Sequence, residues 1–360
     1  MAFISAAEAE VGGYQLQKLF MEKGPSVSKS TPCLKPAEKI LRLTAEDQCL
    51  DKLPKTVSLP PRSLEEACWL SYYVICQSTY AGTHILHHLL TSPPGKGLHL
   101  VPLMLYRHVL DLGDSIGTLF RFGSANSAAV LVRALFETSI GLEFLLQSNS
   151  FHEDRASCYE AFRRIKRLKN LIRYDPGTKE GAKLHAILDS DPKLKDVVFP
   201  RQDLSKDREA VETMLNEKRF RSHWEKYKNA KPRPKDWYGL CSTANDLRGL
   251  AKEVGREAEY LLLYKMLSEV AHASDVMTGV VVIGEAKELS IHQLRGPVEK
   301  IKELVSLAAN YLVWSHNHLL FTYLNGDEVH KRFTRWYIED YREYFNWAIS
   351  PGPLFVEPDD

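Results

Sequence analysis

The chain has 360 residues, of which 44% are hydrophobic and 26% are charged, and its formal net charge at pH 7 is +1. This composition is typical of a soluble globular protein with one large or two ordinary domains. The near-zero net charge gives no overall field that would select nucleic acid or a membrane surface. No run of about 18 uncharged apolar residues is present, and the acidic N-terminus lacks the basic segment of a signal peptide. We therefore expect no membrane association.

The six cysteines are scattered along the chain. No two of them form a C-x-x-C pair, so the sequence predicts neither a zinc site nor a redox pair, and we expect no metal and no other cofactor. Cysteines of this kind in a chain without a signal peptide indicate a reducing cytoplasm as the location. They are Cys33, Cys49, Cys68, Cys76, Cys158 and Cys241.

The chain is expected to have three parts. Residues 1–62 are weakly patterned and rich in Ser, Pro and Lys around 23–36, which predicts an N-terminal arm. Residues 63–326 contain the helical patterns and form the predicted bundle, with a basic insertion at 151–236. Residues 327–360 are rich in aromatic and charged side chains and form the predicted C-terminal tail.

The first strong helix is predicted at 67–90. Ser63 is its N-cap, and Glu66 three residues later completes a capping box. His84 and His88 are four residues apart and share one face of this helix, a spacing that can chelate a metal. No Glu lies between them as in an H-E-x-x-H site. We interpret them as a partly exposed histidine patch and leave metal binding there open.

A second helix is predicted at 99–122. Gly113 and Gly117 have the G-x-x-x-G spacing, which would let another helix approach closely in a bundle. Asp114 lies between them on a polar stripe of the same helix. Two interpretations of Asp114 remain open. It belongs either to a solvated polar face or to a contact with Arg133 of the following helix.

That following helix, at 125–148, is the centre of the predicted bundle. It is apolar almost all round, a pattern typical of a buried helix. Arg133 and Glu137 lie inside it, four residues apart and therefore on one face. A buried charge is costly unless it is paired and hydrogen-bonded. We therefore predict that both side chains are buried and contact the helix at 256–274.

Two further helices, at 256–274 and 297–324, complete the pattern. In the first of them Tyr264, Ser268 and His272 follow each other at intervals of four residues. Val276–Ile283 is a candidate short strand that adds little to the fold. Four long helices and the segment at 256–274 predict an all-α fold, an antiparallel helical bundle with a long basic helical insertion.

The insertion carries the charge asymmetry of the chain. Residues 155–235 hold 22 Lys and Arg against 12 Asp and Glu, a net charge of +10, and the rest of the chain has a net charge of −9. A basic segment interleaved with aromatic residues indicates an anionic partner such as RNA or DNA. The alternative is a helical hairpin that docks on an acidic protein surface, of the same chain or of a second copy in a homo-oligomer. The candidate contact residues are Arg163, Arg164, Arg167, Lys218, Arg221, Trp224 and Lys228.

Two segments of the chain resemble a known family. An Asp in one helix, R-x-L-x-E in the next, and Y-x-x-x-S-x-x-x-H after a W-x-G-like turn are similar to the signature of an uncharacterised, mainly bacterial family of helical proteins, a domain of unknown function. The resemblance covers roughly residues 100–280 and implies a helical fold but no activity. The matching positions are Asp114, Arg133, Glu137, Tyr264, Ser268 and His272.

One hypothesis for the function is a hydrolase or nuclease-like toxin. His272 would act as acid or base, and Arg133 would stabilise the developing charge of a phosphate. Helical RNases of the HEPN superfamily carry an Arg four to six residues before the catalytic His, whereas Met266, Leu267 and Ser268 occupy those positions before His272 in this chain. A nucleophile and base pair of Ser268 and His272 lacks an evident oxyanion hole. Glu269 and His272 form one E-x-x-H unit, whereas a di-iron bundle needs two.

We prefer a second hypothesis, a non-enzymatic binding or effector module. Its basic insertion would bind the anionic partner, while a polar cluster would fix the bundle or line a ligand site. A cluster sealed from solvent favours a structural role, and a cluster that lines an open pocket favours ligand binding or catalysis. The candidate cluster consists of Arg133, Glu137, Ser268 and His272, with Asp114 as a further candidate.

Overall fold

The computed structural model describes residues 59–91, 99–147, 152–194, 201–264, 266–267, 280–283, 288–291, 298–351 and 353. These residues all belong to one compact unit, Cys49–Asp360. Their secondary structure is helical except for one two-stranded antiparallel hairpin. The expected all-α helical bundle is therefore the fold of the described chain.

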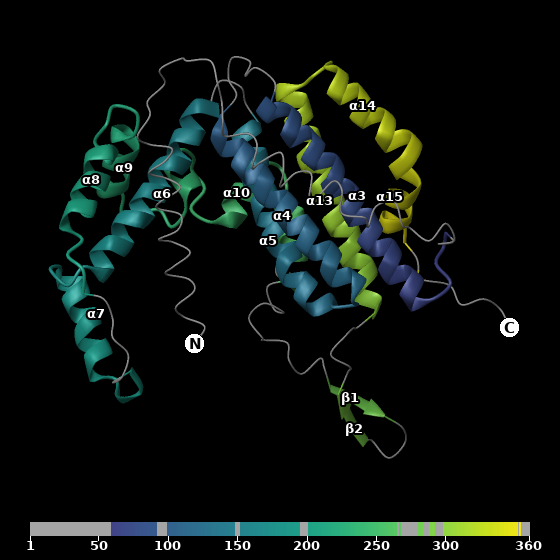
Figure 1. Cartoon of the computed structure of the whole chain (residues 1–360), viewed down its shortest axis with the longest axis horizontal. Helices are drawn as coiled ribbons and strands as arrows, with labels where there is room; N and C mark the ends of the chain where they lie inside the picture. Colours follow the sequence, from purple (N-terminus) through teal and green to yellow (C-terminus); the bar gives the residue numbers. More distant parts are fainter. Residues whose placement is uncertain are drawn as a thin grey trace. The chain divides into compact units, whose positions relative to one another are not determined.

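Four long helices form the bundle. They are α3 (Leu64–Thr91), α4 (Leu100–Arg121), α5 (Ala125–Leu146) and α13 (Val298–Tyr323). Each packs against the next in this order, and α13 closes the ring on α3 (Figure 1). The start of α3 is capped as predicted, because the Ser63 hydroxyl accepts a hydrogen bond from the Glu66 backbone N–H at 3.2 Å.

The helices α3, α4 and α5 follow each other in alternating directions, as expected from the short connections between them. The helix α13 instead runs parallel to α5. Tyr311 of α13 contacts Phe136 of α5. Two turns further along both helices, His318 of α13 lies beside Glu143 of α5. A long excursion separates α5 from α13, so the connection does not force the antiparallel direction that a short loop would impose.

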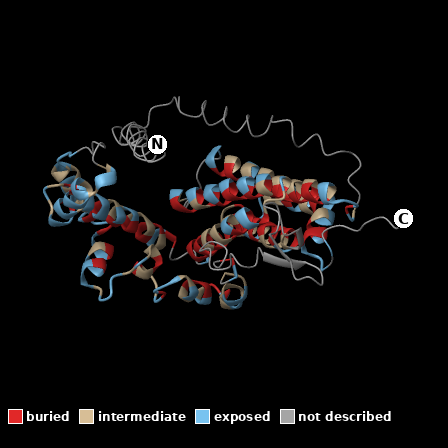
Figure 2. Ribbon diagram, turned by 90° about the horizontal axis from the view of Figure 1, so that it is seen from below, coloured by how far each residue is buried: buried red, intermediate tan, exposed pale blue. Residues whose placement is uncertain are grey.

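The core of the bundle is continuous. Figure 2 shows the buried residues gathered on the facing sides of the long helices. A Cβ atom at Gly113 would lie 2.7 Å from Thr79 Oγ1 of α3 and 2.9 Å from Leu312 Cδ2 of α13. Those distances are shorter than van der Waals contact, so glycine at this position lets the neighbouring helices approach, as its spacing with Gly117 predicted.

Two helices after the bundle cover part of it. They are α14 (Glu328–Trp336) and α15 (Arg342–Ile349), joined by the π-helical turn η6 (Tyr337–Tyr341). The buried Tyr341 hydroxyl donates to the Val74 carbonyl oxygen of α3 at 3.0 Å. These residues of the expected tail therefore pack on the bundle.

The helices between α5 and η3 have a small core of their own. They are α6 (His152–Tyr174), α7 (Lys179–Ser190), η2 (Pro192–Leu194), α8 (Ser205–Leu215), α9 (Arg221–Asn229) and the 3-10 turn η3 (Trp237–Leu240). We call the described residues of 152–240 the basic lobe. Its core side chains are Cys158, Phe162, Ile165, Leu168, Val211, Leu215, Tyr227 and Leu240.

Shorter elements connect the basic lobe to α13. They are α10 (Leu247–Glu253), α11 (Glu257–Glu259), the π-helical turn η4 (Tyr260–Tyr264), β1 (Val280–Ile283) and β2 (Glu288–Ile291). The candidate strand is present as β1, and β2 pairs with it. Of the helices that the structure describes, none is both long enough and apolar enough to cross a membrane.

Candidate functional site

The central helix α5 meets the segment 256–264 at two polar contacts, and the first is centred on Arg133. Its Nε donates to Glu137 Oε1 at 3.1 Å, one turn further along α5. Its Nη2 donates to the Tyr264 hydroxyl at 2.6 Å, and its guanidinium carbon lies 4.6 Å from the centroid of that ring. Arg133 is thus linked to this segment, as the sequence analysis expected.

The burial of this first contact is less than predicted. The Arg133 side chain is 19% exposed and that of Glu137 is 40% exposed, so the expectation of a buried pair was too strong. The reason is that this face of α5 is covered by the turn η4 and not by a long helix of the ring. Solvent therefore reaches the carboxylate and shares in stabilising its charge.

Three other candidates of the predicted cluster do not enter this contact as described. Ser268 and His272 lie outside the described residues. Asp114 is exposed on α4, and the hydrogen bonds that the structure describes around Arg133 do not include it. Desolvation and the charge of Asp111 raise the pKa of Asp114. Of its two interpretations, the polar face of α4 fits this position.

The second contact was not foreseen, and it is more deeply buried. Arg256, which precedes α11, lies with Nη1 3.4 Å from Glu143 Oε2 of α5 and with Nη2 2.7 Å from Glu259 Oε2. Its guanidinium carbon lies 4.0 Å from the Trp314 ring centroid of α13. The side chains of Arg256 and Glu143 are 3% and 8% exposed. A desolvated ion pair with an aromatic face beside it is therefore built from α5, α13 and the segment between.

This environment shifts the ionisation of two groups. Burial raises the pKa of Glu143 to about 7, although the positive charge of Arg256 acts in the opposite direction. Burial, and then the charge of Arg256, lower the pKa of His318 to about 4. The Trp314 indole N–H donates to His318 Nε2, which requires that nitrogen to be unprotonated. At neutral pH the site thus contains a neutral imidazole beside a carboxyl group that exchanges its proton near pH 7.

Residues 99–287 match the model of a family of unknown function, DUF5677. The chain belongs to this family. No curated protein matches the chain, and neither does any solved structure. The match includes Arg133 and Glu143, two charged residues of α5 that meet the segment 256–264.

The matched region ends before α13, so Trp314 and His318 of the second contact lie outside it. The predicted resemblance to an uncharacterised family is thus confirmed by a family model that matches more than half of the chain. Membership in DUF5677 brings no reaction, ligand or partner with it.

The candidate nucleic-acid residues of the basic lobe fall into two groups. Arg163, Lys218, Arg221 and Lys228 are exposed. Arg221 Nε donates to the Asn216 carbonyl oxygen, and Lys228 Nζ lies 2.7 Å from Glu225 Oε1, so two of the four are engaged within the lobe. Arg167 and Trp224 are partly buried.

Arg164 is engaged inside the lobe and does not fit the surface role predicted for it. Its Nη1 lies 3.2 Å from Glu160 Oε2, and its guanidinium carbon lies 4.3 Å from the Phe220 ring centroid. The aromatic residues of the insertion have a similar internal role, since Phe220 and Tyr227 are buried. Part of the basic and aromatic interleaving in the sequence therefore reflects the packing of the lobe itself.

The histidine pair of α3 does not form a group of metal ligands with other described side chains. The ring of His84 packs edge-on against Tyr80, and His88 Nε2 lies 3.9 Å from Asp327 Oδ1. Within the described residues, the one group of three or more His, Cys, Asp or Glu side chains close enough to hold a metal is elsewhere, in the basic lobe. It consists of Asp154, Cys158 and His223.

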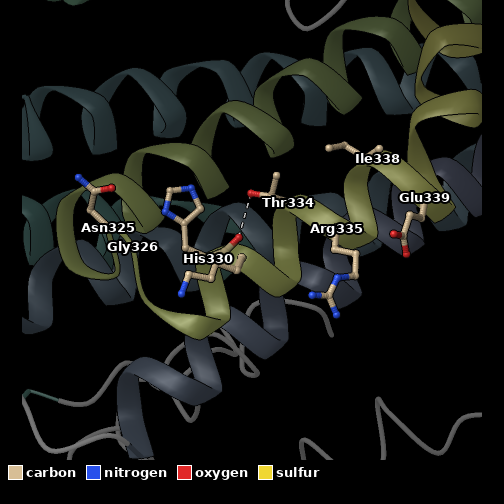
Figure 3. Close-up of a pocket in the computed structure, with 8 residues that line it drawn as sticks. Asn325, Gly326, His330, Thr334, Arg335, Ile338 and Glu339 are labelled. Atoms are coloured by element: carbon tan, nitrogen blue, oxygen red, sulfur yellow. Dashed lines mark hydrogen bonds between the residues drawn. The ribbon is translucent and has the colours of Figure 1, made fainter.

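An open groove of about 510 Å³ lies at the start of the C-terminal helices (Figure 3). It is lined by side chains of α14 and η6 and by the turn before them, and the Thr334 hydroxyl donates to the His330 carbonyl oxygen at 2.9 Å. Its polar lining side chains are on the solvent-facing side of these helices. The groove thus gives no convergent set of buried polar groups of the kind that binds a substrate.

Sequence reasoning missed Glu143, Arg256 and His318, although two signals pointed to them. Glu143 is a charged residue in the same almost fully apolar helix as Arg133 and Glu137, so it needed a partner. His318 follows Trp314 by four residues on a helix that closes the bundle, which puts both on one face. The pairing itself could not be predicted from the sequence, because the whole basic lobe separates Glu143 from Arg256.

Proposed function

We propose that this protein is a non-enzymatic binding module whose basic lobe binds a single strand of RNA or DNA. The observation that supports the proposal is the surrounding of Trp224 on α9. Its indole stacks on Tyr227 with ring centroids 5.9 Å apart and an angle of 10° between the planes. Lys228 Nζ lies 5.2 Å from the Trp224 centroid, and Lys169 Nζ lies 5.0 Å from that of Tyr227.

Single-stranded nucleic acid requires both kinds of group that meet here. Positive side chains follow the phosphates, and an aromatic face stacks with a base. Trp224 is partly exposed, so part of its side chain is accessible, while Lys169, Lys228 and Arg233 are exposed around the two rings. A duplex keeps its bases stacked inside and would use the charges alone. The accessible part of the Trp224 side chain therefore favours a single strand over a duplex.

The net charge of +10 over residues 155–235 supports the same partner. Neutralisation of phosphates by Lys and Arg releases counterions, which gives an affinity that depends on salt and little on sequence. The bundle supplies no comparable excess of positive charge, since the remainder of the chain is at −9. The lobe is therefore the part of the chain where a polyanion would bind.

Fluorescence anisotropy with labelled single-stranded RNA and DNA tests the proposal. For the full chain we expect affinity to fall steeply between about 50 and 200 mM salt. A variant in which Lys169, Lys228 and Arg233 are changed to Ala should bind more weakly, and its salt slope should be smaller by about 0.7 for each phosphate that is no longer neutralised. The matched control changes the same number of exposed positive charges on α14, Lys331, Arg332 and Arg335, and should bind like the wild type.

The substitution Trp224→Leu tests the stacking separately. It should weaken binding by about 1–3 kcal/mol without changing the salt slope, because it removes a base-stacking surface and no charge. Absence of binding at low salt, or equal weakening in the lobe variant and the α14 control, would overturn the proposal. Sedimentation that shows the wild type as a dimer dissociated by the lobe variant would replace nucleic acid with an acidic surface of a second copy.

The hydrolase or nuclease-like toxin remains the alternative. One observation favours it. Arg133 is accessible to solvent and donates to the Tyr264 hydroxyl at 2.6 Å. The sequence pattern predicts that His272 lies on the same helix face as Tyr264. Incubation of the RNA with the wild type separates the two functions. Intact RNA supports the binding module, whereas cleavage that is abolished in Arg133→Ala and His272→Gln supports the enzyme.

We further propose that the protein acts in the cytoplasm. Three cysteines in the described part of the chain, Cys68, Cys158 and Cys241, are free thiols. Free cysteines suit a reducing compartment, where RNA and DNA are also available as partners. Fractionation of cells that produce the tagged full chain tests this location.

A further inference from the structure

Two helices of the basic lobe bring three metal-ligand side chains to one point. Asp154 and Cys158 lie one turn apart on α6, and His223 lies on α9. The Cys158 Sγ is 3.3 Å from His223 Nδ1 and 3.9 Å from His223 Nε2. His223 Nε2 is in turn 3.5 Å from Asp154 Oδ1. One ligand atom from each of the three residues lies within 4.8 Å of the other two.

A second thiol adjoins this group. Cys241, which directly follows η3, is close enough to hydrogen-bond to the Cys158 thiol. Cys158 and His223 are buried, Cys241 is partly exposed and Asp154 is exposed. The group is therefore buried in the lobe on one side and open to solvent on the other, so an ion can reach it from solution.

We propose that Asp154, Cys158, His223 and Cys241 bind one Zn²⁺ ion that holds α6, α9 and the end of η3 together. Nothing in the proposed binding of nucleic acid requires such an ion. The two proposals are independent, although they concern the same lobe.

The spacing of the ligand atoms suits a tetrahedral zinc site. With Zn–S near 2.3 Å and Zn–N or Zn–O near 2.0–2.2 Å, tetrahedral geometry separates ligand atoms by roughly 3.4–3.8 Å. The distances from His223 Nε2 to Cys158 Sγ and to Asp154 Oδ1 are 3.9 and 3.5 Å. Small side-chain adjustments, without movement of the helices, would bring three of the ligands to the required separation.

The ligand types select zinc among the common metals. Thiolate and imidazole are the ligands of Zn²⁺, whereas Mg²⁺ and Ca²⁺ take oxygen ligands almost exclusively. Two thiolates and a carboxylate around Zn²⁺ would leave a net charge of −1. Arg155 and Lys226 lie close enough for their charges to act on the Cys158 group, so the surroundings can compensate it.

The lobe also has a physical use for such a crosslink. Its core consists of few side chains, and small cores are commonly stabilised by a metal or a disulfide. Residues 175–220 separate α6 from α9 in the sequence, and residues 230–236 connect α9 to η3. Zinc would fix α9, which carries Trp224, against α6, which carries Lys169.

Metal analysis of the full chain, purified under reducing conditions without chelator, tests the proposal. We expect about one zinc per chain in the wild type, and loss of that zinc in Cys158→Ser, Cys241→Ser and His223→Gln. Cys68→Ser and Cys76→Ser are the matched controls, because these cysteines lie on α3 and not in the basic lobe. Both controls should keep the zinc of the wild type.

Two measurements on the wild type avoid dependence on variants that fail to fold. Removal of zinc with a strong chelator should lower the melting temperature, and Zn²⁺ but not Mg²⁺ should restore it. Co²⁺ added to the chelated protein should give the sulfur-to-cobalt charge-transfer absorption of thiolate ligands. Wild type that contains no zinc and gives no such absorption would overturn the proposal. A Cys158–Cys241 disulfide in protein kept under reducing conditions would also overturn it.

Discussion

Arg256 and Glu143 form an ion pair in which both side chains are almost completely buried, with Nη1 and Oε2 3.4 Å apart. The two residues lie on either side of the basic lobe in the sequence, so this pair fastens the chain that returns from the lobe to the central helix α5. The pair of Arg133 and Glu137 on the same helix is shorter, at 3.1 Å, yet it is more exposed. Burial and not distance should decide which of the two matters more for stability.

The first prediction compares the two arginines. Arg256→Ala leaves Glu143 and Glu259 without their partner in a buried site and should lower the free energy of unfolding by about 3–5 kcal/mol. Arg133→Ala leaves a half-exposed carboxylate that water can solvate and should cost about 1 kcal/mol. Urea denaturation of both variants measures the difference. Equal losses of stability would contradict the argument from burial.

The second prediction concerns the pH dependence that Glu143 imposes. Its pKa is raised from an ordinary 4.5 to about 7, so between these values the folded chain keeps a proton that the unfolded chain releases. Its contribution to stability is therefore fully present below about pH 4.5 and is lost as the pH rises toward 7. Relative to Glu143→Gln, the wild type should lose about 3 kcal/mol of unfolding free energy over this interval.

Glu137→Gln is the control for this experiment, because Glu137 is on the same helix and is partly solvated. Its difference from the wild type should change little between the same pH values. Comparing each variant with the wild type at each pH cancels the titration of other groups. A difference between wild type and Glu143→Gln that stays constant from pH 4.5 to 7.5 would show that Glu143 is ionised throughout.

His318 should act in the opposite direction. Its pKa is lowered from 6.5 to about 4, so the unfolded chain binds the proton more readily over that interval. This contribution is present above about pH 6.5 and is lost as the pH falls toward 4. Relative to His318→Gln, the wild type should therefore become less stable on acidification. Denaturation of the His318→Gln variant at pH 4.5 and 6.5 measures this, and a constant difference would contradict it.

The sequence predicted the long helices well because their signals are local. The capping box at Ser63 and the apolar periodicity of α3, α4, α5 and α13 both lie within single segments. The sequence also predicted a polar contact of Arg133 with the segment after residue 256, since a charge in an apolar helix needs a partner. It overestimated the burial of Glu137. How completely other residues cover α5 depends on the tertiary structure, which local sequence patterns do not show.

The pairings across long separations could not be predicted. Asp154 and Cys158 have the i, i+4 spacing, but nothing local indicates that His223 and Cys241 return to them. The same holds for Glu143 with Arg256. In each case the contact depends on how the basic lobe folds back, and that path is set by many small packing contributions.

The next prediction tests a buried hydrogen-bonded histidine in the centre of the bundle. His316 of α13 is fully buried, with Nδ1 2.7 Å from the Tyr106 hydroxyl and Nε2 2.9 Å from the Ser78 carbonyl oxygen. Tyr106→Phe removes the partner of Nδ1 inside the core and should cost about 1–3 kcal/mol. Tyr174→Phe on the exposed end of α6 is the control and should be neutral. Equal stability of the two variants would mean that another group or water replaces the hydroxyl.

The last prediction uses two glycines of the bundle whose surroundings differ. A Cβ atom at Gly82 of α3 would lie 2.5 Å from Leu110 Cδ2 and 2.6 Å from His316 Cε1, both in the packed core. Gly82→Ala should therefore destabilise the chain by about 1–3 kcal/mol, although alanine is the better helix former.

At Gly141 of α5 the nearest atom to a Cβ would be Trp237 Cζ2 at 3.7 Å, an ordinary contact. Gly141→Ala should accordingly stabilise the chain by about 0.5–1 kcal/mol through helix propensity alone. Thermal unfolding of the two variants should thus give shifts of opposite sign, and a stabilising shift for Gly82→Ala would show that α3 has room to move away from α4 and α13.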